Sequence, residues 1–174
     1  MEENINKKGF TLIEVVTSLF IIVLLSGIIL VNYRQGNKQY ALFRSANRLA
    51  QDIRRAQQMA MSTKECPAGT GCAGQIPAGY GIYLNAGGTN YLLYADDGSE
   101  DHGVGDTDIE IIPLESGVSI QSTSPASLSI NFKPPDPTTK INGGLADEGV
   151  ITLALQSGLS KTIKVNKAGL IWVE

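Results

Sequence analysis

The sequence contains one histidine and two cysteines in 174 residues, which is little material for a zinc-type centre or for a nucleophile paired with a general base. It also lacks the composition of a disordered chain, because 43% of its residues are apolar and 18% are charged. Its 19 glycines show no three-residue period, which excludes a collagen-like chain. Formal charge is absent from all of residues 15–33, and this excludes a plain soluble globule.

The charges that are present are unevenly distributed. Residues 34–64 carry a net charge of +6, whereas residues 65–174 carry −8. We therefore expect a basic helical segment joined to an acidic C-terminal region.

The uncharged residues 15–33 would span roughly 28 Å as a helix, close to the hydrocarbon thickness of about 30 Å. They predict a membrane-spanning helix. A cleaved secretory signal is the alternative. The apolar run of a typical secretory signal is, however, shorter than residues 15–33 and ends at a small-residue cleavage site. The lysines and arginines on the two sides are balanced in number, so they do not set the orientation.

A compact motif stands directly before this apolar run. It consists of Lys7, Lys8, Gly9 and Phe10, and Glu14 follows Phe10 by four residues. A glycine offers a protease a backbone without a side chain, and an ionisable residue inside an apolar helix is a candidate functional residue. The stretch closely resembles the class III signal of type IV prepilins and type II secretion pseudopilins.

The resemblance implies that a membrane-embedded prepilin peptidase cuts between Gly9 and Phe10 and methylates the new amine of Phe10. It also implies that the basic leader, residues 1–9, stays in the cytoplasm, while the rest is a single-pass protein of the inner membrane with its head outside. Glu14 would pair with the N-terminal amine of a neighbouring subunit during assembly. The implied partners are the peptidase, other pilin or pseudopilin subunits and an inner-membrane assembly platform, and the chain would be a structural subunit, not an enzyme.

Beyond residue 33, apolar residues recur at spacings of three and four, which predicts that the helix continues to about Ser62 with this face on a core. The residues concerned are Leu42, Phe43, Ala46, Leu49, Ala50, Ile53, Ala56 and Ala60. The cations fall mostly on the opposite face. This face is interpreted as solvated, as packed against acidic heads of neighbouring subunits, or as a nucleic-acid surface. The last is least favoured, because no aromatic residues are interleaved with the cations.

Residues 64–174 alternate short apolar runs with turns, as antiparallel strands do. The predicted fold is α+β: a long N-terminal helix, membrane-spanning over residues 10–33 and amphipathic over 34–63, packed on an antiparallel sheet. The order of the apolar runs is similar to that of H-type minor pseudopilins and minor fimbrial pilins. The predicted strands are Tyr80–Leu84, Tyr91–Tyr94, Ile109–Ile112, Val118–Gln121, Leu128–Phe132, Val150–Leu155, Thr162–Val165 and Leu170–Val173.

Two connections in this region have distinctive composition. Asn166–Gly169 predicts the turn of a C-terminal hairpin, and the proline-rich stretch Lys133–Thr139 predicts a surface loop. Cys66 and Cys72 enclose a third, short loop rich in proline and glycine. Outside the cytoplasm we expect these two cysteines to form a disulfide, with two free thiols or a metal site as alternatives.

Residues 96–108 place six acidic residues and His102 in a glycine-rich loop. The loop is interpreted as a solvated connection, as a partner contact or as a calcium site, although its spacing does not follow the EF-hand pattern. The calcium candidates are Asp96, Asp97, Asp101, Asp106 and Asp108. No other cofactor is expected, and His102 has no marked serine or cysteine partner for catalysis.

Two alternatives to a structural filament subunit remain. A DNA-receptor subunit of a competence pilus would need a cationic patch on the head, for which Lys161, Lys164 and Lys167 are the candidates. A single-span membrane protein with an exported β domain would keep its leader and would not depend on Glu14.

Overall fold

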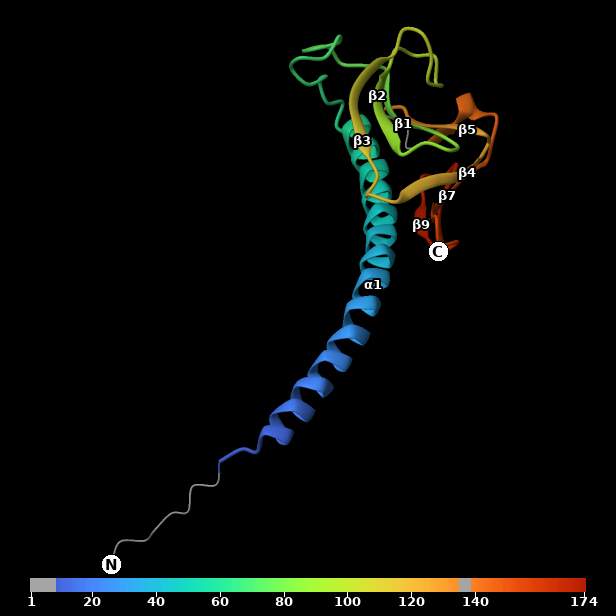
Figure 1. Cartoon of the computed structure of the whole chain (residues 1–174). Coiled ribbons are helices and arrows are strands. Elements are labelled where there is room, and N and C mark those ends of the chain that lie inside the picture. The colour runs from blue at the N-terminus through green and yellow to red at the C-terminus, as the bar shows by residue number, and fades with distance from the viewer. Residues whose placement is uncertain (1–8, 135–138) are drawn as a thin grey trace, which may run out of the picture. The chain divides into compact units, whose positions relative to one another are not determined.

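The structure is a computed structural model that describes residues 9–134 and 139–174, with side chains described outside residues 29–35. It divides into two compact units, with the boundary between Asn37 and Lys38. The α1 helix (Leu12–Met61) has 50 residues and includes this boundary (Figure 1). The helix ends one residue before the predicted end at Ser62.

Within the second unit, α1 buries one stripe of side chains. Leu49 and Ile53 are completely buried in this stripe. The predicted apolar face is confirmed except at Phe43, whose side chain is 55% exposed. Phe43 follows the buried Leu42 by one position, which is about 100° around the helix, so it lies beside the stripe. The stripe also includes residues that were not predicted, namely Ala41, Ser45 and Met59.

The strands form two antiparallel sheets with the orders β3-β2-β1-β5-β6 and β4-β7-β8-β9. The strands of the first sheet are β1 (Gly79–Asn85), β2 (Asn90–Asp96), β3 (Thr107–Pro113), β5 (Ser127–Phe132) and β6 (Thr139–Ile141). Those of the second are β4 (Val118–Ser124), β7 (Glu148–Leu155), β8 (Ser160–Asn166) and β9 (Ile171–Val173). A short 3₁₀ helix, η1 (Asn142–Gly144), follows β6.

All eight predicted strands are present, but the prediction of one sheet is wrong because the strands divide between two. Alternating apolar residues show which face of a strand is buried and do not show which strands pair. The short strand β6 was missed. Thr139, which was predicted to lie in the proline-rich loop, begins β6 and pairs with Phe132, while residues 135–138 of that loop lie outside the described residues.

One hydrophobic core joins the helical stripe to both sheets. Alternate residues of each sheet point into it, so that each sheet buries one face against shared apolar side chains. Completely buried examples are Ile82, Leu93 and Ile130 from the first sheet and Ile120, Leu153 and Ile163 from the second. The α+β prediction is therefore confirmed, with a core that contains two sheets and the second part of α1.

The C-terminal hairpin is confirmed at its predicted turn. Gly169 has φ = +76°, a conformation that glycine adopts readily. Its N–H donates a hydrogen bond to the carbonyl oxygen of Asn166 at 2.9 Å, which closes the turn between β8 and β9.

A partly buried hydrogen bond connects α1 to the first sheet. The hydroxyl of Tyr91 in β2 donates to Oδ2 of Asp52 in α1 at 2.5 Å. Burial raises the pKa of Tyr91 well above its usual value, and the hydrogen bond to Asp52 raises it further, so the hydroxyl keeps its proton at physiological pH. Tyr91 is 2% exposed and the side chain of Asp52 is 16% exposed, so the donor is buried and the acceptor only partly.

Replacing Tyr91 by phenylalanine should destabilise the second unit by about 1.5–3 kcal/mol, the usual worth of a hydrogen bond to a charged group. The free energy of unfolding, measured by chemical denaturation of the full chain in detergent, tests this. Tyr40→Phe is the matched control, because Tyr40 is 68% exposed, and it should change that free energy by less than about 0.5 kcal/mol. Equal effects of the two variants would contradict the prediction.

Candidate functional site

The N-terminal motif lies partly within the described residues. Gly9 and Phe10 precede α1 in an exposed, non-helical segment, and Phe10 is 83% exposed. A Cβ placed on Gly9 would meet no atom within 4 Å. The backbone at the predicted cleavage point is therefore open to a protease, while Lys7 and Lys8 lie outside the described residues.

Glu14 lies in the first turn of α1, which begins where the carbonyl oxygen of Thr11 accepts the N–H of Glu14 at 3.1 Å. A carboxylate in this turn interacts favourably with the helix dipole. The hydroxyls of Thr17 and Ser18 donate to the backbone carbonyl oxygen of Glu14 and not to its carboxylate. Within residues 9–134 and 139–174, that carboxylate forms no hydrogen bond or ion pair inside the chain. It is thus available to a group from outside the chain.

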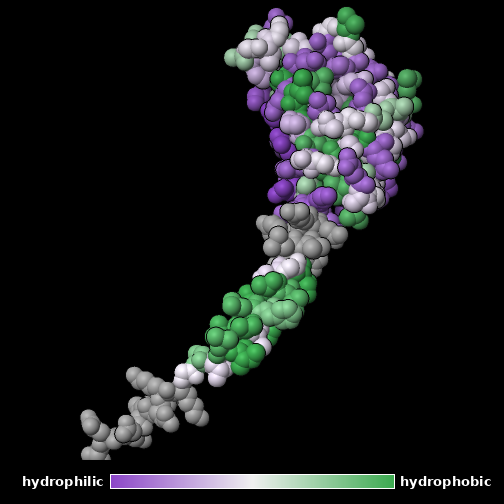
Figure 2. Space-filling view, in the orientation of Figure 1, coloured by the Kyte–Doolittle hydropathy of each residue, from purple (hydrophilic) through white to green (hydrophobic). Residues whose placement is uncertain are grey.

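The first unit has an apolar surface. Its large apolar side chains from Phe10 to Ile28 are each at least 49% exposed, and Figure 2 shows this segment in green. Exposed apolar surface of this extent marks contact with a membrane or with other proteins.

In the part of the chain that the structure describes, no helix reaches the length and apolarity that crossing a membrane requires. The span predicted over residues 15–33 stays a prediction.

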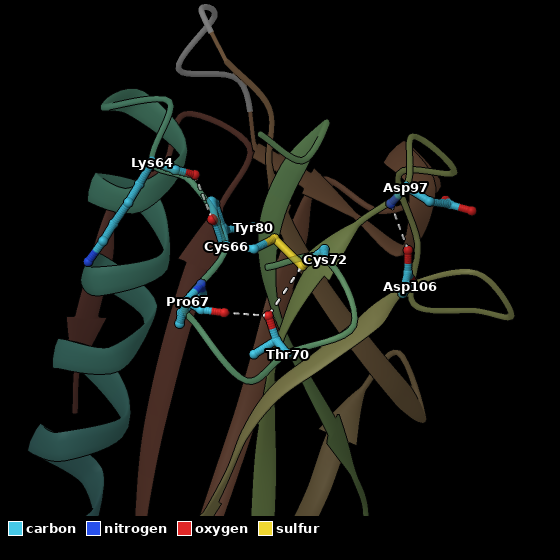
Figure 3. The surroundings of a disulfide bond; sticks show 8 residues. All are labelled: Lys64, Cys66, Pro67, Thr70, Cys72, Tyr80, Asp97 and Asp106. Atoms are coloured by element: carbon cyan, nitrogen blue, oxygen red, sulfur yellow. Dashed lines mark hydrogen bonds between the residues drawn. A yellow bond between two sulfur atoms is a disulfide. The ribbon is translucent and has the colours of Figure 1, made fainter. Parts of the chain in front are cut away.

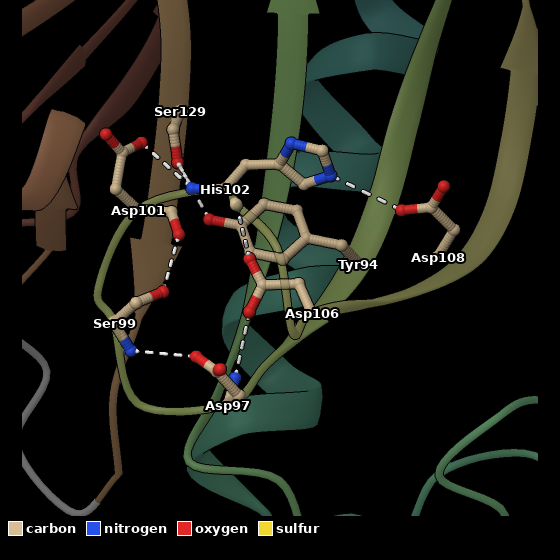
Figure 4. Close-up of polar contacts among 9 residues, drawn as sticks. Tyr94, Asp97, Ser99, Asp101, His102, Asp106, Asp108 and Ser129 are labelled. Atoms are coloured by element: carbon tan, nitrogen blue, oxygen red, sulfur yellow. Dashed lines mark hydrogen bonds and ion pairs between the residues drawn. The ribbon is translucent and has the colours of Figure 1, made fainter.

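The acidic loop between β2 and β3 separates the five calcium candidates into two groups. Asp96, Asp97 and Asp106 each place one carboxylate oxygen within 4.8 Å of the others. Asp101 and Asp108 are outside this group. They lie on opposite sides of His102 in Figure 4. The geometry thus selects three of the five predicted residues.

Backbone donors hold part of this group in place. The N–H groups of Asp97 and Gly103 each donate to one carboxylate oxygen of Asp106 at 2.9 Å (Figure 4). Burial raises the pKa of Asp106 above its usual value, and the charges of Asp96 and Asp97 raise it further, against the two backbone donors. The three carboxylates therefore lie in an environment of unbalanced negative charge.

His102 has a structural position in the loop. Its ring stacks on Tyr83 at 4.3 Å between centroids and meets the edge of Tyr94 at 4.9 Å. Its Nε2 lies 3.3 Å from a carboxylate oxygen of Asp108. Tyr94 in turn shares a hydrogen bond of 2.7 Å with Ser129. His102 therefore fixes the loop to the first sheet through Tyr83 and Tyr94.

A second contact fixes the loop through charge. Glu100 forms ion pairs with Lys133 at 3.0 Å and Lys140 at 3.3 Å. The hydrogen bond from Lys133, followed by that from Lys140, lowers the pKa of Glu100 below its usual value. Sequence reasoning missed both lysines and Tyr83, because each lies far from the loop along the chain and only the sheet pairing brings it close.

Cys66 and Cys72 form a disulfide with 5.6 Å between their Cα atoms (Figure 3). The loop that they close lies between the end of α1 and β1, where the hydroxyl of Tyr80 donates to the carbonyl oxygen of Lys64 at 2.6 Å. Within the loop, Thr70 donates to the carbonyl oxygen of Pro67. These bonds fix the connection from the helix to the first sheet.

The basic face of α1 is largely paired within the chain. Arg55 lies 2.9 Å from Glu110, Arg44 lies 3.5 Å from Glu115, and Arg48 lies 3.8 Å from Asp52. Arg54 donates to the carbonyl oxygen of Ile171 at 3.1 Å. The sequence did not predict these contacts: Arg54 and Arg55 connect the helix to β9 and β3, Arg44 connects it to the turn between β3 and β4, and Arg48 pairs within the helix.

The lysines near the C-terminal hairpin are also paired. Lys164 lies 2.9 Å from Glu174, and Lys167 lies 3.1 Å from Asp147. The hydrogen bond from Lys164 lowers the pKa of Glu174, so both groups stay charged at neutral pH. Two of the three lysines that a DNA-binding surface would use thus have acidic neighbours, which disfavours binding of a polyanion.

Comparison with known proteins gives one result for the N-terminus. Residues 4–30 match the family described as the prokaryotic N-terminal methylation motif. The motif is that of type IV prepilin-like precursors, which are structural subunits and not enzymes. The matched segment contains Gly9, Phe10 and Glu14. No curated protein and no solved structure matches the chain.

Proposed function

We propose that the chain is a structural subunit of a type IV pilin-like filament, made as a precursor and cleaved between Gly9 and Phe10. The observation that carries the proposal is the match of residues 4–30 to the N-terminal methylation motif. The exposed, non-helical backbone at Gly9 and Phe10 supports it, because a protease binds its substrate in an extended form. The new amine of Phe10 is then methylated by the same peptidase.

In this proposal the precursor is anchored in the inner membrane through residues 15–33, with the head outside. The uncharged sequence of this segment and its exposed apolar side chains support the anchoring. The Cys66–Cys72 disulfide supports the placement of the head, because disulfides persist in oxidising compartments outside the cytoplasm. On assembly, neighbouring subunits replace lipid around the same apolar surface.

We further propose that the chain is a minor pilin or pseudopilin, of a type IV pilus or of a type II secretion pseudopilus. The order of apolar runs in residues 80–173, similar to H-type minor pseudopilins and minor fimbrial pilins, supports this assignment. The partners are then the peptidase, the other subunits and the assembly platform of the inner membrane. The paired lysines of the hairpin give no support to a DNA-receptor subunit.

Processing gives the sharpest test of the proposal. The chain is co-expressed with a prepilin peptidase, and its intact mass and N-terminal sequence are measured. We expect a chain that starts at Phe10 and carries one added methyl group.

Gly9→Val is the matched variant, because a side chain at Gly9 meets no atom within 4 Å and the fold should tolerate it. We expect this variant to keep Met1 and the full-length mass, since the added side chain obstructs only the peptidase. If Met1 also persists in the wild-type chain while a known prepilin is processed, the proposal is wrong. The chain would then be a single-span protein with an exported β domain.

A further inference from the structure

Three carboxylates meet where β2 leaves the first sheet and β3 enters it. Asp96 is the last residue of β2, Asp97 follows it, and Asp106 directly precedes β3. Because β2 and β3 are antiparallel neighbours, the end of one lies beside the start of the other. One oxygen from each carboxylate lies within 4.8 Å of the other two.

Asp96 carries the second and independent observation. The residue is 1% exposed, and its Oδ2 has no hydrogen-bond partner. Its Oδ1 accepts the N–H of Glu100 at 3.2 Å and the hydroxyl of Ser99 at 3.4 Å. A buried carboxylate oxygen without a donor is unfavourable, and a water molecule, a proton or a cation has to compensate it.

The chain supplies no cation to this group. Among residues 9–134 and 139–174, none of the three carboxylates forms an ion pair with a lysine or arginine. Lys133 and Lys140, which contact the same loop, are paired with Glu100. The histidine of the loop faces Asp108. The negative charge of the group is therefore left for a ligand from solution.

The group of three carboxylates is accessible from solvent. Asp96 and Asp97 line a surface pocket of about 380 Å³, which also includes Gly105 on one side and Cys72 of the disulfide loop on the other. A Cβ on Gly105 would clash with Oδ2 of Asp97, so only glycine leaves room for this carboxylate. The pocket is wide enough for a cation that keeps some of its water molecules.

We propose that Asp96, Asp97 and Asp106 bind one calcium ion. Two oxygens that each lie about 2.4 Å from one ion can be at most about 4.8 Å apart, which the three carboxylates satisfy. Magnesium requires near-ideal octahedral geometry and gives up its water molecules reluctantly, which disfavours its binding by three protein carboxylates. Zinc prefers nitrogen and sulfur ligands, and His102 and Cys72 are engaged elsewhere.

The ion joins residues that are up to ten positions apart and closes the loop 97–106 against the sheet. Glu100 and His102 already hold the middle of this loop. Calcium would hold its two ends, so that the loop is fixed along its whole length. The site lies in the second unit and does not depend on how the N-terminus is processed.

Calcium binding by the full-length chain in detergent micelles tests the proposal. After treatment with a chelator, binding of ⁴⁵Ca²⁺ is measured by equilibrium dialysis. We expect one ion per chain with a Kd on the order of 10⁻⁴ M, as for extracellular calcium modules. At about 100 times the Kd, calcium should raise Tm by about 5–10 °C, and the same concentration of magnesium should raise it much less.

Variants locate the bound ion. Asp106→Asn and Asp97→Asn should each weaken calcium binding at least tenfold, and Asp97→Asn preserves the test if Asp106→Asn does not fold. Asp101→Asn is the matched control, because Asp101 belongs to the same loop but lies outside the group, and it should bind like the wild type. Absence of binding to the wild type, or equal binding by all three variants, overturns the proposal. So does equal stabilisation by magnesium.

Discussion

Replacing Glu14 by glutamine should abolish incorporation of the chain into filaments and leave its processing and membrane insertion intact. The side chain keeps its shape and loses only its charge. In the proposed filament the first turn of α1 is surrounded by apolar side chains of neighbours, where a carboxylate is stable only beside a cation. In this proposal, the methylated amine of Phe10 in a neighbouring subunit is that cation.

Removing one partner of a buried ion pair costs about 3–5 kcal/mol, which corresponds to a loss of incorporation on the order of 100-fold or more. The measurement is the amount of chain in sheared filaments, relative to the membrane fraction, in a host with the assembly system. Glu14→Asp is the control that keeps the charge and should retain part of the incorporation.

A purely local role predicts a different result. If Glu14 only stabilises the helix N-terminus through the dipole, its loss costs about 0.3–1 kcal/mol and affects helix content more than assembly. Wild-type incorporation of the glutamine variant would therefore show that Glu14 does not hold subunits in register. Processing by the peptidase, measured in the same cells, separates this outcome from a failure to mature.

The local features of the chain were predictable from its sequence. The helical stripe around Leu49 and Ile53, the eight strands and the turn at Gly169 each depend on residues close together along the chain. Apolar residues spaced by three and four predict a helix, apolar residues at alternate positions predict a strand, and certain residue types predict a turn. These rules use only neighbouring residues, and the structure follows them here. The N-terminal motif was readable for the same reason, since all its residues lie within one short segment.

Features that depend on distant pairing were not predictable. The division into two sheets is set by β4 pairing with β7, which follows it by more than 20 residues. The ion pairs of Arg44 with Glu115 and of Arg55 with Glu110 likewise join positions at least 55 residues apart. The basic face of the helix therefore looked free in the sequence and is paired in the fold.

The acidic loop shows the same limit within one candidate site. Five aspartates were equivalent by sequence, and the antiparallel ends of β2 and β3 bring only three of them together. The burial of Asp96, which is 1% exposed, had no signal in the sequence.

Replacing Leu49 by alanine should destabilise the second unit by about 2–5 kcal/mol, a large part of the total stability of an ordinary domain. Leu49 is completely buried in the α1 stripe, within the core that this stripe shares with both sheets, so the missing atoms leave a cavity. The free energy of unfolding is measured by urea denaturation of the full chain in detergent. Trp172 in β9, the only tryptophan of the chain, reports the transition by its fluorescence.

Phe43→Ala is the matched comparison, since it removes a larger side chain six residues earlier on the same helix. Phe43 is 55% exposed, so its loss should change the free energy of unfolding by about 0.5 kcal/mol or less. Hydrophobicity alone predicts the opposite order, because phenylalanine carries more apolar surface than leucine. A larger effect at Phe43 than at Leu49 would place the helix in a different rotation on the sheets. It would also remove the basis for the ion pairs of Arg44 and Arg55, whose positions depend on that rotation.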